Sequence, residues 1–215
     1  MRKHVMFQCL KEGGSAQIEI KKSRFIATLA PVTSEEEAAA FIAETKKKYW
    51  NAKHNCSAFV IGEGAAITRC NDDGEPAGSA GRPMLQVLLG TNVCNVCAVV
   101  TRYFGGTLLG VGGLIRAYQD AVKEGLKECV IVQRAAGKRF LVETDYARSG
   151  KLQTLFAQEN VIVEKSDYGE RVTFTIILLT EQEEDITSRI TDVTDGSAVF
   201  TDAGETVVEL PVKRE

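Results

Sequence analysis

Apolar residues recur at helical spacing in one early segment of the chain, residues 34–49. The positions are Ala38, Phe41, Ile42 and Tyr49, which share one side of a helix. Ser34 is followed three residues later by Glu37, the spacing of a capping box. Acidic residues 35–37 open the segment and basic residues 46–48 close it, as suits the helix dipole. The pattern predicts a helix and explains the lysine run without a binding role.

Short apolar runs between turn residues predict strands around this helix. They cover residues 15–20, 24–31, 56–61, 65–70 and 96–104, with a hairpin turn at 62–64. Pro83 suits the first turn of a short helix that ends at Gly90. A second apolar stripe predicts a helix over 114–128.

Beyond residue 137 the pattern changes to strand, helix, strand, strand, helix, strand. The expected segments are 139–144, 147–159, 161–166, 171–179, 181–193 and 206–212. This βαββαβ order is the ferredoxin-like order. We therefore predict an α+β protein with two domains, 1–136 and 137–215.

The composition limits the classes of protein to which the chain can belong. Of the 215 residues 44% are hydrophobic and 26% are charged, as in folded globular proteins. The chain has no run of about twenty apolar residues, so we expect no membrane-spanning helix. Residues 1–5 lack the apolar stretch of a signal peptide, and we expect a cytoplasmic protein. Residues 1–137 carry 17 Lys/Arg against 13 Asp/Glu (+4), whereas 138–215 carry 9 against 16 (−7).

The six cysteines are scattered, and only Cys94 and Cys97 have a suggestive spacing. A zinc site needs about four ligands, usually with a second Cys or His pair, which is absent. The two cysteines belong to a strand-like stretch, where they would point to opposite faces. We expect reduced, buried thiols and neither a metal nor a cofactor.

A glycine-rich stretch, 105–113, lies between the last of these strands and the helix at 114–128. Its glycines are Gly105, Gly106, Gly110, Gly112 and Gly113. A helix N-terminus after such a loop favours an anion, and Arg102 and Arg116 flank it. Known nucleotide motifs fail, since Val111-Gly112 replaces the phosphate-loop Lys-Ser/Thr and Ile115 replaces the last dinucleotide glycine. The alternative is a tight connection packed on a neighbour.

Asp72, Asp73 and Glu75 form a second candidate, because clustered carboxylates hold hard cations or act as acid and base. The alternative is an acidic surface turn. Arg82 follows this loop and joins the anion-binding candidates, whereas a lone His54 favours a structural role. We expect residues 72–82 and 105–113 to approach one another and form one pocket or groove.

Three long motifs, residues 72–83, 99–106 and 110–118, closely resemble the core of the IMPACT family. The organisation of the chain resembles that of the family's bacterial YigZ branch. Ser23-Arg24-Phe25 and Asn55-Cys56 fit the same pattern. The resemblance implies an N-terminal domain similar to the ribosomal-protein and elongation-factor-G domain IV fold. It also implies a C-terminal domain similar to domain V of that factor. Eukaryotic relatives bind an activator of the amino-acid-starvation kinase and so regulate translation.

Two hypotheses remain open. The first is a noncatalytic, translation-linked module that binds RNA, the ribosome or a translation-associated protein. The second is an enzyme or ligand-binding protein that holds a phosphate-bearing small molecule between the Asp72 and Gly105 loops.

Overall fold

The computed structural model describes residues 7–212, and the chain in it divides into two compact units. Phe7–Gln133 make up most of one, the N-terminal unit, and Arg134–Leu210 most of the other, the C-terminal unit. The expectation about a signal peptide concerns residues 1–5, which lie outside the described part. Between residues 7 and 212, no helix combines the length and the apolarity that crossing a bilayer requires.

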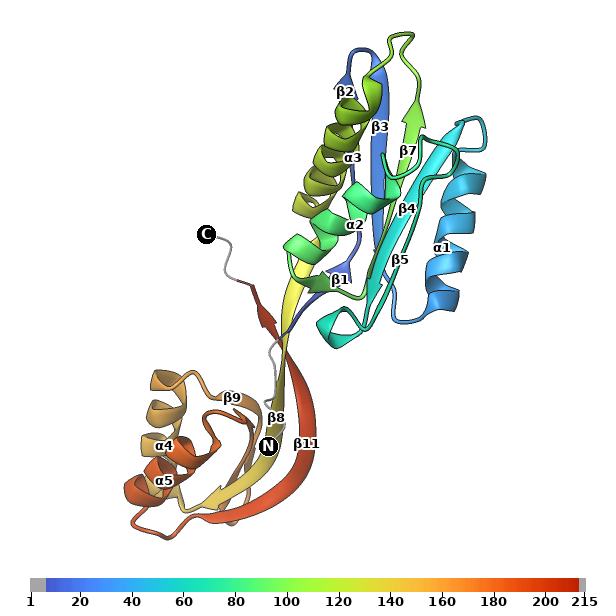
Figure 1. Ribbon diagram of the computed structural model, residues 1–215. Coiled ribbons are helices and arrows are strands. Elements are labelled where there is room, and N and C mark those ends of the chain that lie inside the picture. Colours follow the sequence, from blue (N-terminus) through green and yellow to red (C-terminus); the bar gives the residue numbers. More distant parts are fainter. Residues whose placement is uncertain (1–6, 213–215) are drawn as a thin grey trace. The chain divides into compact units, whose positions relative to one another are not determined.

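The N-terminal unit is built on an antiparallel five-stranded sheet in the order β2-β3-β7-β4-β5. Its elements are β1 (Phe7–Glu12), β2 (Gly14–Ile20), β3 (Ser23–Pro31), α1 (Glu35–Lys48), β4 (His54–Ile61), a 3-10 turn (Glu63–Ala65), β5 (Ile67–Asn71), α2 (Gly81–Gly90), β6 (Val93–Cys94), β7 (Val96–Tyr103) and α3 (Gly110–Lys127). Helices α2 and α3 cover one face of the sheet and α1 the other (Figure 1).

Each face of this sheet has its own apolar core. Val96, Ala98 and Val100 of β7 pack with residues of α2 and α3. Cys97 and Val99, which alternate with them, pack with Ala38 of α1 and its neighbours. The central strand is therefore apolar on both faces, as its continuous hydrophobic run requires.

The helix predicted over 34–49 is confirmed, since α1 spans Glu35–Lys48 with Ser34 as its N-cap. Ser34 Oγ accepts from Glu37 N at 3.2 Å. The Glu37 side chain accepts from Thr33 N at 2.6 Å, one residue before the expected box. Strand β1, which pairs in parallel with β6, was not predicted.

The C-terminal unit has the predicted βαββαβ order. It contains β8 (Val130–Thr144), α4 (Tyr146–Gln158), β9 (Ile162–Tyr168), β10 (Val172–Leu179), α5 (Glu183–Val193) and β11 (Val199–Pro211). The strand order is β9-β10-β8-β11. Phe140, Leu152, Phe156 and Phe174 are among the buried side chains that join its sheet to its helices. The last strand begins at Val199, seven residues before the predicted start at 206.

Strand β8 continues without interruption across the division between Gln133 and Arg134. The predicted boundary at 136/137 lies inside this strand, where Gly137 pairs with Leu179. Hydrogen-bonded strands resist proteolysis in the native state. Expression of a separate fragment therefore tests the domain boundary better than proteolysis does.

We expect residues 134–215, expressed alone, to fold cooperatively, because this segment holds its own apolar core and four hydrogen-bonded strands in the order β9-β10-β8-β11. The measurement is thermal unfolding followed by circular dichroism. A fragment without a cooperative transition would show that the C-terminal unit depends on the rest of the chain.

Candidate nucleic-acid interface

The Asp72 carboxylate accepts hydrogen bonds from backbone N–H groups just before and at the start of α2. Its oxygens accept from Gly78 N (2.8 Å), Ala80 N (3.0 Å) and Gly81 N (2.8 Å). Burial opposes ionisation, yet these three N–H groups keep the pKa of Asp72 below its ordinary value. Asp72 thus closes the loop and caps the helix.

Asp73 is engaged in a similar way. It accepts from Lys46 Nζ at 2.6 Å and from Asn55 N at 2.7 Å. Burial works against the charge, but these contacts hold the pKa of Asp73 below its usual range. His54 Nδ1 lies 2.9 Å from the Asp73 carbonyl oxygen, so the ring is a contact of the same loop.

Glu75 forms the most buried ion pair of the N-terminal unit. Its Oε1 lies 2.6 Å from Nη1 of Arg102, and the side chains are 3% and 7% exposed. Tyr118 Oη donates to the same oxygen at 2.9 Å. The sequence made Arg102 a candidate for an anion contact beside the glycine-rich stretch. The geometry instead favours a structural Arg102 whose partner is Glu75.

Five of the six cysteines are buried, and all six are free thiols. Cys56 and Cys97 are buried, and burial raises the pKa of each thiol to about 12, so both stay protonated. Cys94 and Cys97 belong to cores on opposite faces of the sheet. Within residues 7–212, no cluster of three or more His, Cys, Asp or Glu side chains is arranged to hold a metal ion. Cys70 is the one exposed cysteine of the six.

The glycine-rich stretch packs against the turn between β2 and β3. Gly105 N donates to Ser23 Oγ at 3.0 Å. A Cβ at Gly105 would lie 2.0 Å from the carbonyl carbon of Lys22, so only glycine permits this approach. The acidic loop reaches this region through Glu75, which contacts Arg102 and Tyr118 on either side of the stretch. The shared pocket stays a prediction.

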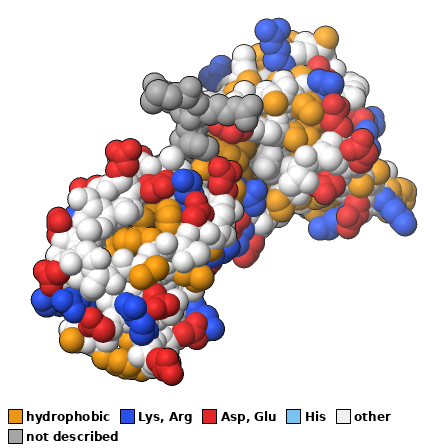
Figure 2. Space-filling model, turned by 90° about the horizontal axis from the view of Figure 1, so that it is seen from below, with side chains coloured by type: hydrophobic (Ala, Val, Ile, Leu, Met, Phe, Trp, Pro, Cys, Tyr) orange, Lys and Arg blue, Asp and Glu red, His pale blue; other side chains and the backbone are white. Residues whose placement is uncertain are grey.

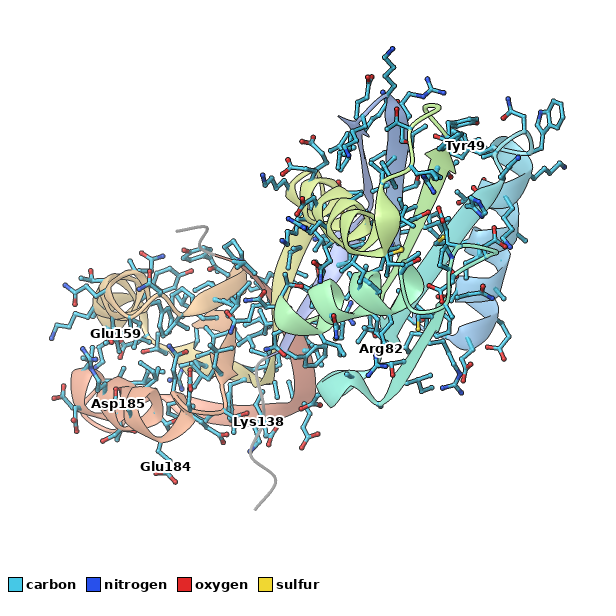
Figure 3. All side chains as sticks on the ribbon, turned by 45° about the horizontal axis from the view of Figure 1, so that its top comes forward. Tyr49, Arg82, Lys138, Glu159, Glu184 and Asp185 are labelled. Carbon is cyan, nitrogen blue, oxygen red and sulfur yellow. The ribbon has the colours of Figure 1, made fainter. Side chains whose placement is uncertain are left out.

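The other candidates are spread over the unit. Helix α3 begins at Gly110, so Gly110, Gly112 and Gly113 lie in its first turn rather than in a loop ending at 113, while Gly106 stays in the connection. Arg116 is exposed and donates to Gly112 O at 3.3 Å. Arg82 is exposed at the start of α2, well away from Tyr49 at the end of α1 (Figure 3).

Three connections meet at one end of the sheet, which we call the loop end: Lys21-Lys22, residues 49–53 and residues 104–109. Arg24 pairs with Tyr103 across β3 and β7, and Arg102 pairs with His54 across β7 and β4. Tyr103 Oη donates to Asn51 Oδ1 at 2.7 Å, which ties the second connection to the third. Sequence periodicity did not bring these segments together.

The loop end is basic. The chain has no Asp or Glu in residues 20–34, 45–62 or 76–119, the three stretches that contain the connections. Their exposed cations at or beside the loop end are Lys21, Lys22, Arg24, Lys47, Lys48 and Lys53. The net charge of the N-terminal unit does not reveal this basic surface, because acidic residues elsewhere in the unit offset its positive charge. The three acid-free stretches are the signal that would have found it.

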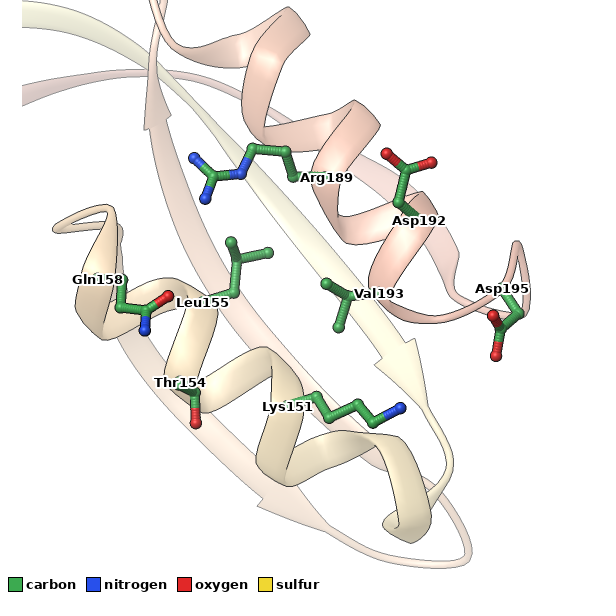
Figure 4. A pocket seen from close by; sticks show the side chains of 8 residues that line it. All are labelled: Lys151, Thr154, Leu155, Gln158, Arg189, Asp192, Val193 and Asp195. Atoms are coloured by element: carbon green, nitrogen blue, oxygen red, sulfur yellow. The ribbon is translucent and has the colours of Figure 1, made fainter.

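The C-terminal unit has a different character. Residues 134–210 carry 8 Lys/Arg against 15 Asp/Glu, a net charge of −7. A cavity of about 590 Å³ lies between α4 and α5 (Figure 4). It is lined by Lys151, Thr154, Leu155, Gln158, Arg189, Asp192, Val193 and Asp195. Arg189 is already paired with Glu159 at 2.8 Å. On the face of the molecule seen in Figure 2, acidic and basic side chains are interspersed rather than gathered by sign.

Comparisons with known proteins cover both units. The family described as Impact N-terminal domain matches residues 21–126, and a domain of unknown function (DUF1949) matches residues 142–197. IMPACT family member YvyE of Bacillus subtilis (strain 168) is 42% identical over 203 residues, which are 94% of each chain. IMPACT family member YigZ of Escherichia coli (strain K12) is 35% identical over 83% of this chain and 89% of that protein. A crystal structure titled as that of a hypothetical protein covers 98% of both chains with 31% identity and a TM-score of 0.59.

Proposed function

Since the chain belongs to the IMPACT family, we propose that it is a noncatalytic, translation-linked protein that binds RNA, free or in the ribosome, through the loop end of its N-terminal unit. The proposal includes a cytoplasmic location. The observation that carries it is the two-lysine turn between β2 and β3.

Lys21 and Lys22 form the whole turn, since Ile20 pairs directly with Ser23. Their φ angles are 47° and 64°. Two positive φ angles define a type I′ turn, which strongly prefers Asn and Gly. For other residues this conformation costs roughly 1–2 kcal/mol per position. Two exposed lysines held at such a cost indicate that their charge is needed at the tip of the hairpin.

The surroundings of the turn support an anionic partner. Among residues 7–212 no ion pair engages Lys21, Lys22 or Lys53. The carboxylates of Asp73 and Glu75, beside the ends of β4 and β7, are neutralised by Lys46 and Arg102. Lysines free to approach phosphates are the electrostatic footprint of RNA binding.

Fold-level analogy supports the link to translation. The βαββαβ order with strand order β9-β10-β8-β11 fits the ferredoxin-like fold. The family resemblance likens the two units to domains IV and V of elongation factor G. The acidic C-terminal unit is, in this proposal, the part that does not contact RNA.

The alternative function, a phosphate-bearing ligand at the Asp72 and Gly105 loops, gains no support from the geometry. The carboxylates of all three acidic candidates, Asp72, Asp73 and Glu75, accept hydrogen bonds from donors of the protein itself. Arg116 remains exposed and stays a candidate for a phosphate contact.

The experiment is the double substitution Lys21→Asn/Lys22→Gly, which replaces the lysines with the residues that this turn prefers. We expect the free energy of unfolding to rise by about 1 kcal/mol, because the relief of strain exceeds the entropic cost of glycine. We expect weaker RNA binding, with a salt slope lowered by roughly 1.4 because two phosphate contacts are lost. The measurements are a salt titration of RNA binding and denaturant unfolding.

The matched control is Lys123→Gln/Lys127→Gln, which removes the same charge from exposed positions late in α3. It should change RNA binding much less. If both double variants bind RNA equally well, the loop end is not the RNA-binding surface.

A further inference from the structure

The chain's single tryptophan, Trp50, is 82% exposed at the loop end. Phe104 (56%) and Leu108 (83%) are exposed in the connection between β7 and α3. Large aromatic side chains are highly buried on average, so two exposed together at one end of a domain require an explanation.

The segments that carry these side chains are held in place by contacts within the protein. Asn51, next to Trp50, accepts from Tyr103, next to Phe104. The Arg24 guanidinium lies 4.7 Å from the centre of the Tyr103 ring, and that of Arg102 lies 5.7 Å from the centre of the Phe104 ring. Arg102 is in turn fixed by Glu75. The aromatic groups are therefore held at the surface beside the lysines instead of folding into the core.

Exposed aromatic rings next to unpaired lysines match the chemistry of a single-stranded nucleic acid. Its bases present open faces that stack on aromatic side chains while its phosphates meet the cations. In a duplex these faces are covered by neighbouring base pairs. We propose that the loop end binds unpaired nucleotides, with bases stacked on Trp50 and Phe104 and with Lys21, Lys22 and Lys53 on the phosphates. This inference rests on the proposed function and specifies the form of RNA.

The position of Trp50 makes the test direct, because the whole tryptophan emission of the protein comes from this site. The full chain is titrated with a mixed-sequence 12-nucleotide single-stranded RNA and with the blunt duplex of the same sequence. We expect the single strand to quench the emission and to bind more tightly than the duplex.

Affinities of variants are then measured by fluorescence anisotropy of labelled RNA. Trp50→Ala should weaken single-strand binding roughly 5- to 150-fold, the range for loss of one base–aromatic stack. Trp50→Phe should restore part of the affinity because it keeps a ring. The control is Leu89→Ala, which removes a 45% exposed apolar side chain of α2 and should leave binding unchanged.

Three outcomes would overturn the inference. If Trp50→Ala binds RNA normally while Lys21→Asn/Lys22→Gly does not, RNA is held by its phosphates alone and the proposed function stands without stacking. Equal affinity for the duplex would likewise exclude stacking and leave the proposed function in place. If no RNA binds at low salt, and vesicles with anionic phosphatidylglycerol shift the Trp50 emission to the blue, the loop end is a membrane-contacting surface and both proposals fail.

Discussion

Replacing Glu75 by alanine should lower the free energy of unfolding of the N-terminal unit by about 3–5 kcal/mol, the cost of leaving one member of a buried ion pair without its partner. The Arg102 guanidinium would stay buried without a partner, since its side chain is 7% exposed and lies near the rings of Phe25 and Phe104. Tyr118 would also lose its acceptor. Denaturant unfolding of the full chain measures the loss.

Two further variants make this expectation specific. Glu75→Leu/Arg102→Met should recover part of the loss, because removing both charges leaves no buried ion uncompensated. Asp120→Ala breaks an exposed pair with Lys123 and should change stability by at most about 1 kcal/mol. Should Glu75→Ala prove as stable as Asp120→Ala, the buried pair cannot hold the acidic loop in place.

A methyl group at Gly105 should be almost as damaging. In Gly105→Ala the new Cβ would lie 2.0 Å from Lys22 C and 2.2 Å from Ser23 N, and both are backbone atoms that cannot rotate away. We expect a loss of about 3 kcal/mol, the upper part of the usual range for overpacking. Because the clash separates the β2–β3 turn from the β7–α3 connection, RNA binding should fall as well. Thermal unfolding and anisotropy measure the two effects.

Gly112→Ala is the matched control from the same stretch. Nothing lies within 4 Å of its Cβ position, and the residue is helical. Alanine there should stabilise the protein by about 0.4–1 kcal/mol, because it lowers the conformational entropy of the unfolded chain. If Gly105→Ala behaves like Gly112→Ala, the close approach of Gly105 to the turn does not form in solution.

Local signals explain which elements could be predicted. The cap at Ser34 and the charges along α1 act over a few residues, and the prediction of that helix is confirmed. Strand β1 carries polar residues and pairs in parallel with the two residues of β6, far along the chain. No local pattern encodes such a pairing. The start of α3 was predicted too late because glycine is a poor helix former, whereas tertiary packing of Leu114 and Tyr118 overrides that propensity.

The candidate site shows the same limit. Charged residues beside glycines suggest a ligand, which made Arg102 and the acidic loop candidates. The fold instead joins Arg102 to Glu75, a pairing across 27 positions that spacing cannot reveal. Trp50 and the Lys21-Lys22 turn were overlooked because neither belongs to a motif. Only the pairing of β2, β3, β7 and β4 places them at one end.

The uninterrupted strand β8 has a consequence for synthesis of the chain. When residue 133 leaves the ribosome, nearly the whole N-terminal unit is available to fold. The rest of β8 then emerges before its neighbour β10, which ends 35 residues after Thr144. At 5–20 residues per second this interval lasts roughly 2–7 s. During that time a nascent strand with Phe140 and Val142 on one side has unpaired edges. The moment of greatest risk of misassembly therefore falls between the two folding events.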